Sequence, residues 1–169
     1  ADLEEMLPKA YIEAISGRPG PVWLDIPLDI QQSTQALNIP RAELPAKLGH
    51  SEALIISCRQ IIAKLQESRR PLILGGTGVR LAGIENRLLA LIEKYGIPMS
   101  TAWTHDIIAS DHPLCAGRPG TIGTRAGNFC LQASDFLLVL GSRLNVRQTS
   151  YNWDSFAKNA WLAQVDIDV

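Results

Sequence analysis

The feature that most constrains this chain is an alternation, beginning at residue 51, between short apolar runs and segments of helical periodicity. Residues 72–74, 136–140 and 161–165 form such runs, and their apolar side chains do not alternate regularly with polar ones. Strands of this kind are buried on both faces, as in parallel sheets. Because helical segments separate them along the chain, the pattern predicts an α/β fold, an open parallel sheet with helices on both faces.

Capping and stop signals delimit the predicted helices of this region. Ser51 suits the N-cap of a helix that runs through Gln66, and Gly96 suits the end of a helix over 84–95. A further helical segment is predicted over 128–132. Residues 97–101 form a candidate strand, although a proline at 98 is unfavourable there.

The beginning of the chain has a different pattern. Pro8 is predicted at the first position of a helix over 8–16, where its missing N–H has no cost, and Gly17 is predicted to end that helix. The apolar residues between Pro21 and Pro27 predict a buried strand.

A polar stretch punctuated by prolines, residues 31–49, is typical of a linker. The sequence therefore predicts three parts. Residues 1–30 are a first part, residues 31–49 are a linker, and residues 50–169 are the main domain.

Charge and composition exclude several classes of partner. The 169 residues include 16 Lys+Arg and 17 Asp+Glu, a net charge of −1. Such a chain lacks the basic surface that binds nucleic acid or an anionic membrane. No apolar run reaches the roughly 18–20 residues of a membrane helix. No nucleic-acid or membrane partner is therefore expected.

The cysteines and histidines do not form a recognisable metal site. Cys58, Cys115 and Cys130 have no C-x-x-C spacing and indicate reduced thiols in a cytoplasmic protein. The three histidines are scattered, and although His105 and His112 flank two aspartates they lack the spacing of a zinc-binding helix. No metal ligands are predicted.

Glycines, arginines and aspartates follow the predicted strands. In open parallel sheets, ligands bind beyond the carboxyl ends of the strands. Glycines allow backbone N–H groups to approach a phosphate, arginine binds phosphate bidentately, and a carboxylate can accept from ribose hydroxyls. The same residues are also compatible with tight turns, a flexible loop and surface ion pairs. No nucleophile–base pair accompanies them, so the pattern predicts a binding module without catalytic residues.

Four segments resemble one enzyme family. The motif Gly-Arg-Pro-Gly-Pro-Val-Trp-Leu-Asp-Ile-Pro-Leu-Asp at 17–29 is similar to the end of the pyrimidine-binding domain of thiamine-diphosphate-dependent enzymes, acetolactate synthase and its relatives above all. Residues 117–123, 133–143 and 165–168 resemble the central domain of the same family, in the same order. The resemblance implies that residues 1–30 are the C-terminal tail of the pyrimidine-binding domain. It also implies a Rossmann-like sheet for residues 50–169, truncated at its C-terminus.

The resemblance also implies a longer parent enzyme whose catalytic and thiamine-binding motifs lie outside this chain. The parent would be a transferase or lyase acting on 2-oxo acids, a homodimer or homotetramer that binds thiamine diphosphate and Mg²⁺. The catalytic glutamate of the family lies earlier, and the Gly-Asp-Gly motif that binds magnesium and diphosphate lies later. This sequence contains no Gly-Asp-Gly. The resemblance therefore implies that the chain alone has no thiamine-dependent activity.

In this family the central domain binds FAD without redox chemistry, or an ADP activator, or no ligand. The first two cases imply cofactor contacts at the strand ends. The implied contacts are Gly75, Gly76, Thr77, Arg80, Thr101, Ala102, Gly120, Thr121, Ile122, Gly123, Gly141, Ser142, Arg143, Arg147, Asp166 and Ile167.

The alternative is a purely structural or oligomerisation domain with an empty nucleotide site. Two departures from the acetolactate synthase pattern favour this alternative over an FAD site. Leu144-Asn145-Val146 replaces the usual Phe-Asp-Asp, and the loop 117–123 lacks the usual histidine. The two arginines at 143 and 147 distinguish these interpretations, because a diphosphate site needs them at the cleft.

Overall fold

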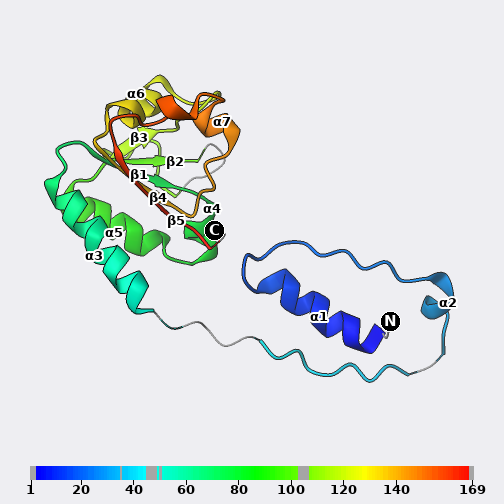
Figure 1. Cartoon of the computed structure of the whole chain (residues 1–169). Coiled ribbons are helices and arrows are strands. Elements are labelled where there is room, and N and C mark those ends of the chain that lie inside the picture. The colour runs from blue at the N-terminus through cyan, green and yellow to red at the C-terminus, as the bar shows by residue number, and fades with distance from the viewer. Residues whose placement is uncertain (1–2, 35, 45–48, 50, 103–106, 168–169) are drawn as a thin grey trace. The chain divides into compact units, whose positions relative to one another are not determined.

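The computed structural model, shown in Figure 1, describes the chain except residues 1–2, 35, 45–48, 50, 103–106 and 168–169. It divides into two compact units, residues 1–49 and residues 50–169.

The first unit begins with helix α1 (Leu3–Ile15), which starts earlier than predicted. Pro8 lies inside this helix, so its expected place at the first position was wrong. A proline there removes a single backbone hydrogen bond near the helix start, and the acidic side chains of Glu4 and Glu5 in the first turn favour a start at that point. Gly17, as predicted, follows the helix in the left-handed conformation, with φ of 56°.

The strand expected between Pro21 and Pro27 does not form. The described part of residues 1–49 contains α1 and the short helix α2 (Leu28–Gln31) but no strand. Trp23, in the middle of the apolar run, is 91% exposed. A strand needs a neighbour for its backbone hydrogen bonds, and the described residues of this unit provide none.

The second unit contains a five-stranded parallel sheet, coloured from green to red in Figure 1. Its strands are β1 (Pro71–Gly75), β2 (Met99–Thr101), β3 (Cys115–Gly117), β4 (Phe136–Leu140) and β5 (Trp161–Val165). The order across the sheet is β3-β2-β1-β4-β5, and every pairing is parallel. Four of these strands follow the predicted runs. Strand β3 was not predicted.

Helices connect the strands. They are α3 (Glu52–Glu67), α4 (Thr77–Leu81), α5 (Glu85–Tyr95), α6 (Arg125–Ala133) and α7 (Val146–Thr149), with a short 3₁₀ turn at Trp153–Ser155. Two predicted end signals are confirmed. The Ser51 hydroxyl accepts from the Leu54 amide at 3.2 Å, and Gly96 ends α5 with φ of 63°.

Apolar side chains cover both faces of the sheet. Successive residues of β1 point to opposite faces, so Ile73 packs on one side with Leu88 and Ile92 of α5, whereas Leu72 and Leu74 pack on the other side with Leu131 of α6. The prediction of an open parallel sheet with helices on both faces is therefore confirmed.

Asp135 fixes the amino end of the sheet. Its carboxylate accepts hydrogen bonds from the Ser68 hydroxyl and from the amides of Arg69 and Arg70, at 3.0 and 2.9 Å for the two amides. The hydrogen bond from Ser68, with those from the two amides, lowers the pKa of Asp135 from 3.8 to about 2. One carboxylate thus joins the turn between α3 and β1 to the start of β4.

Candidate functional site

The strand order creates a topological switch point between β1 and β4. From β1 the chain continues to β2 and β3 on one side of the sheet, then crosses to β4 and β5 on the other. At such a point the loops after two neighbouring strands run in opposite directions, and ligands of open α/β sheets bind there. The loops after β1 and β4 are two of the segments in which the sequence predicts cofactor contacts.

The loop after β1 is in direct backbone contact with the loop after β4. The Gly76 amide donates to the Leu140 carbonyl at 2.8 Å, and the Gly78 amide donates to the Gly141 carbonyl at 2.9 Å. A Cβ added at Gly78 would lie 2.6 Å from the Gly141 Cα. These glycines therefore serve loop-to-loop packing, and the amides of Gly76 and Gly78 are engaged within the protein.

The carboxyl ends of β2 and β5 are hydrogen-bonded to the carboxyl ends of β1 and β4. The Ala102 amide, after β2, donates to the Gly75 carbonyl at 2.9 Å, and the Gly141 amide donates to the Val165 carbonyl of β5 at 2.8 Å. Thr101 is 4% exposed. A Cβ added at Gly75 would lie 2.5 Å from the Met99 methyl carbon and would displace the end of that side chain.

The loop between β3 and α6 packs on the loop that contains α7. The Arg147 carbonyl accepts from the Thr121 amide at 2.9 Å and from the Thr121 hydroxyl at 3.1 Å. Gly120 has φ of 112°, and a Cβ added there would lie 2.5 Å from the same carbonyl. The predicted contact residues of these two loops are thus brought together.

Side chains of α6 hold the shape of this loop. Asn128 accepts from the Gly120 amide at 2.9 Å and donates to the Gly120 carbonyl at 3.3 Å. Thr124 accepts from the amides of Arg118 and Gly127 and thereby caps α6. Ile122 remains 65% exposed. These hydrogen bonds connect the loop to α6 at several points.

The loop after β4 is built around a buried serine. The Ser142 hydroxyl donates to Gln148 Oε1 at 3.2 Å, and the Ser142 carbonyl accepts from Gln164 Nε2 of β5 at 3.0 Å. Leu144 has φ of 53°, a left-handed conformation that is uncommon for leucine. Asn145 caps α7 by accepting from the Arg147 amide at 3.0 Å.

Three predicted arginines lie at the surface of this edge. Arg80 Nε lies 3.9 Å from Glu85 Oε1. Arg143 is exposed and forms no ion pair with the residues that the structure describes. Arg147 is exposed while its backbone joins the two loops. Asp166, after β5, accepts from the Ile167 amide at 2.8 Å, which shapes the last described turn.

Gln148 was missed by the sequence analysis. It is 5% exposed, and its Nε2 has no hydrogen-bond partner among the described residues. A glutamine on a four-residue helix carries no signal in the sequence that distinguishes it from a solvent-exposed one. A Cβ added at Gly120 would lie 3.1 Å from the Gln148 Cα, so the Gly120 loop approaches the backbone of α7 closely at this residue.

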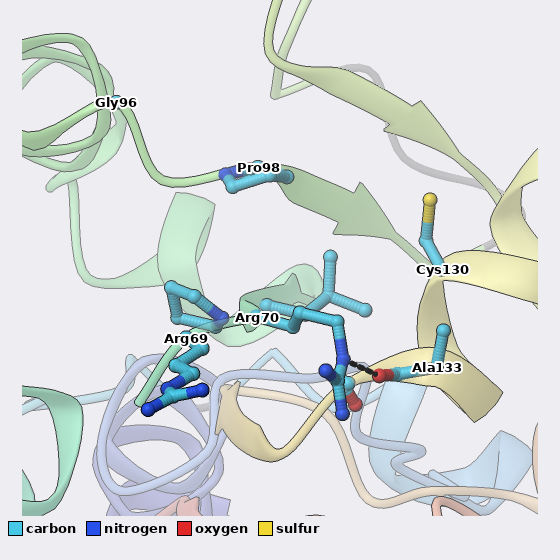
Figure 2. Close-up of a pocket in the computed structure, with 9 residues that line it drawn as sticks. Arg69, Arg70, Gly96, Pro98, Cys130 and Ala133 are labelled. Atoms are coloured by element: carbon cyan, nitrogen blue, oxygen red, sulfur yellow. Dashed lines mark hydrogen bonds between the residues drawn. The ribbon is translucent and has the colours of Figure 1, made fainter. Parts of the chain in front are cut away.

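A cavity at the amino ends of the strands was also missed by the sequence analysis. Figure 2 shows this cavity of about 400 Å³, which is lined by residues at the amino ends of β1 and β2 and at the end of α6. Arg70 Nε donates to the Ala133 carbonyl at 2.7 Å beside it. None of the predicted contact residues lines this cavity.

The described residues contain no group of three or more His, Cys, Asp or Glu side chains able to hold a metal ion, and His105 lies outside them. Among these residues there is also no helix with the length and apolarity needed to cross a membrane.

Comparison with known proteins supplies the family context. A family model described as "Thiamine pyrophosphate enzyme, central domain" matches residues 58–169. The chain is 38% identical over 173 residues to a probable acetolactate synthase large subunit of Methanococcus aeolicus, with 98% of this chain and 28% of the relative covered. It is 36% identical over 173 residues to the acetolactate synthase isozyme 1 large subunit of Escherichia coli, with 99% of this chain and 29% of the relative covered.

A third relative, the acetolactate synthase large subunit of Lactococcus lactis, is 34% identical over 170 residues, with 99% of this chain and 29% of the relative covered. The chain thus spans less than a third of the length of these relatives.

Proposed function

The chain belongs to the thiamine pyrophosphate enzymes, whose central domain it contains, and we propose that this domain binds the ADP portion of FAD, or ADP itself, in a non-redox role. The ligand would lie beyond the carboxyl ends of β1 and β4 and would support structure or regulation. The chain itself would contribute no catalytic residue.

The observation that carries this proposal is the assembly of the predicted contact loops at one edge of the sheet. Backbone hydrogen bonds join the loop after β1 to the loop after β4, and the Arg147 carbonyl accepts from the Thr121 amide of the loop after β3. A switch point with arginines beside it suits a diphosphate, because guanidinium groups bind phosphate oxygens bidentately.

The hydrogen bonds of the glycine loop bear on which groups we propose as phosphate contacts. The amides of Gly76 and Gly78 already donate to carbonyls of the β4 loop. We therefore assign the diphosphate to the guanidinium groups of Arg143 and Arg147, with Arg80 at the margin. This differs from a glycine-rich loop that cradles phosphate with its own amides.

For the parent enzyme we propose an acetolactate-synthase-like activity. It would join or cleave 2-oxo acids with thiamine diphosphate and Mg²⁺ bound by other domains, in a homodimer or homotetramer. The three free thiols, Cys58, Cys115 and Cys130, are consistent with a cytoplasmic location.

A thermal-shift titration of the 169-residue chain tests the nucleotide proposal. ADP and FAD at about 100 times their Kd should stabilise the folded chain by about 2.7 kcal/mol, a shift of several degrees in melting temperature. Thiamine diphosphate serves as the comparison ligand. An unchanged melting temperature with millimolar ADP and FAD, together with a colourless parent enzyme, would overturn the proposal.

A structural role with an empty site is the second candidate, and one observation favours it. Helix α3 leaves Leu54, Ile55 and Ile62 between 44% and 53% exposed, an apolar surface suited to a neighbouring domain or subunit. In that case ADP and FAD would not change the melting temperature. Substituting these three residues by Gln would weaken association of the parent, which sedimentation velocity would detect.

A further inference from the structure

The cavity at the amino ends of β1 and β2 combines two cationic side chains with a largely apolar lining. Its volume of about 400 Å³ lies within the range of sites that hold small molecules. Arg69 and Arg70 supply the charge, and none of the described residues that line the cavity is acidic. Its apolar walls come from Pro71, Leu72, Pro98 and Ala133.

Arg70 is held in place by contacts that leave the end of its side chain available. Its Nε donates to the Ala133 carbonyl at the end of α6 at 2.7 Å, as Figure 2 shows. Its amide donates to Asp135 Oδ1 at 2.9 Å. Neither Nη atom is used in a hydrogen bond with the residues that the structure describes. A guanidinium group positioned in this way loses little freedom when it binds an anion.

Asp135 is the negative group beside both arginines, but it does not neutralise them. Its carboxylate accepts from the amides of Arg69 and Arg70 and from the Ser68 hydroxyl. Among the described residues, it forms no ion pair with either guanidinium group. The two guanidinium groups and one carboxylate leave an excess of one positive charge, which suits a monoanion better than a diphosphate.

The other polar groups of the lining are engaged within the protein. Ser134 is 2% exposed, and its hydroxyl donates to the Leu131 carbonyl at 2.7 Å. The Gly96 amide donates to the Ile92 carbonyl at the end of α5. The two prolines of the lining have no N–H. The guanidinium groups are therefore the donors that the described lining offers to a ligand.

We propose that this cavity binds a small organic monocarboxylate with an aliphatic body. The carboxylate accepts from Arg69 and from the Nη atoms of Arg70, because guanidinium groups bind carboxylates with two parallel hydrogen bonds. The aliphatic body covers Pro71, Pro98 and Ala133 and removes apolar surface from water. A phosphate ion would match the charge but would leave these walls in water. The inference is independent of the nucleotide proposal, which concerns the carboxyl ends of the strands.

Two free cysteines allow occupancy of the cavity to be measured in the 169-residue chain. Cys130 lines the cavity, whereas Cys58 is exposed on α3 and serves as the internal reference. The measurement is the rate at which iodoacetamide alkylates each thiol, read by peptide mass spectrometry. With 4-methylpentanoate at about ten times its Kd, alkylation of Cys130 should slow about tenfold, because only the unoccupied fraction reacts. Alkylation of Cys58 should not change.

Two other probes separate the parts of the ligand. The neutral 4-methylpentanamide keeps the aliphatic body and lacks the charge, and inorganic phosphate has the charge and lacks the body. Both should protect Cys130 much less than 4-methylpentanoate does. Equal protection by the amide would overturn the role of the arginines, and equal protection by phosphate would overturn the role of the apolar walls.

Arg69→Gln tests the charge and keeps the backbone amide that donates to Asp135. The affinity for 4-methylpentanoate should fall about tenfold or more, since a hydrogen bond to a charged acceptor is lost. Arg87→Gln, at an exposed position of α5 outside the lining, is the matched control and should leave the affinity unchanged. An equal loss in both variants would indicate a general charge effect and overturn the site.

Ala133→Leu tests the cavity itself, because a larger side chain fills the space while the carbonyl that accepts from Arg70 is kept. Alkylation of Cys130 should be slow without any probe, and 4-methylpentanoate should slow it no further. Circular dichroism confirms that both lining variants fold. The absence of saturable protection of Cys130 in the unsubstituted chain, up to tens of millimolar 4-methylpentanoate, would overturn the proposal. None of these results depends on whether the chain binds ADP or FAD.

Discussion

The Gly78 amide donates to the Gly141 carbonyl at 2.9 Å, and this contact joins the loops after β1 and β4 at the switch point of the sheet. Gly141 has φ of 58°, and a Cβ added there would lie 2.5 Å from the Gly78 Cα. The two glycines therefore set how closely the two loops approach.

Gly141→Ala should destabilise the domain more than a glycine substitution that adds only backbone strain. Gly96→Ala is the matched control, because Gly96 has φ of 63° but no atom within 4 Å of an added Cβ. We expect about 1–2 kcal/mol for the control and a clearly larger loss for Gly141→Ala, measured by urea unfolding. Equal losses would show that the loop contact contributes nothing.

Gly120→Ala tests the contact between the β3–α6 loop and α7. A Cβ at this position would push against the Arg147 carbonyl, and φ of 112° adds strain. Because the Thr121 hydrogen bonds to that carbonyl would be broken, we expect reduced stability and ADP binding weakened by about tenfold or more. Wild-type affinity for ADP in a folded variant would contradict the proposed site.

Arg143→Gln and Arg147→Gln test the assignment of the diphosphate. Each should weaken ADP binding by about tenfold or more, and the affinity of the unsubstituted chain should fall with added salt. Arg87→Gln, at an exposed position of α5, provides the matched loss of one positive charge. Isothermal titration calorimetry measures all three, and an equal effect at Arg87 would indicate a general charge effect instead of a site.

Asp135 predicts how the stability of the domain responds to acid. Its folded pKa of about 2 lies below the ordinary 3.8, so its stabilising effect is complete above roughly pH 4. That effect is lost as the pH falls toward 2. Asp135→Asn should lower the melting temperature at neutral pH and reduce its dependence on pH between 4 and 2. Asp111→Asn, at an exposed position, should preserve both.

The sequence predicted the sheet and its helices because burial on both faces leaves a direct pattern of apolar residues. Strand β3 was missed for the same reason. Its three residues, Cys115–Gly117, are only partly buried and form an outermost strand of the sheet, so no apolar run marks them. The strand predicted near Trp23 failed because pattern alone does not supply a pairing neighbour.

The position of the expected loops was predictable, but their contacts were not. Glycines and arginines after the predicted strands indicated loops at the carboxyl ends of the sheet, and the loops lie there. The engagement of the Gly76 and Gly78 amides depends on the approach of the β4 loop, which is a tertiary contact. The close approach of Gly120 to the Gln148 backbone is a tertiary contact as well, so neither could be derived from local sequence.

The most direct test of the nucleotide site is an amide NMR titration of the ¹⁵N-labelled chain with ADP. The proposed site predicts the largest saturable shift changes at Thr121, Ser142 and Arg147, beyond the carboxyl ends of the strands. Changes centred on the cavity at Arg70 and Ser134, at the opposite edge of the sheet, or no changes with millimolar ADP, would contradict it.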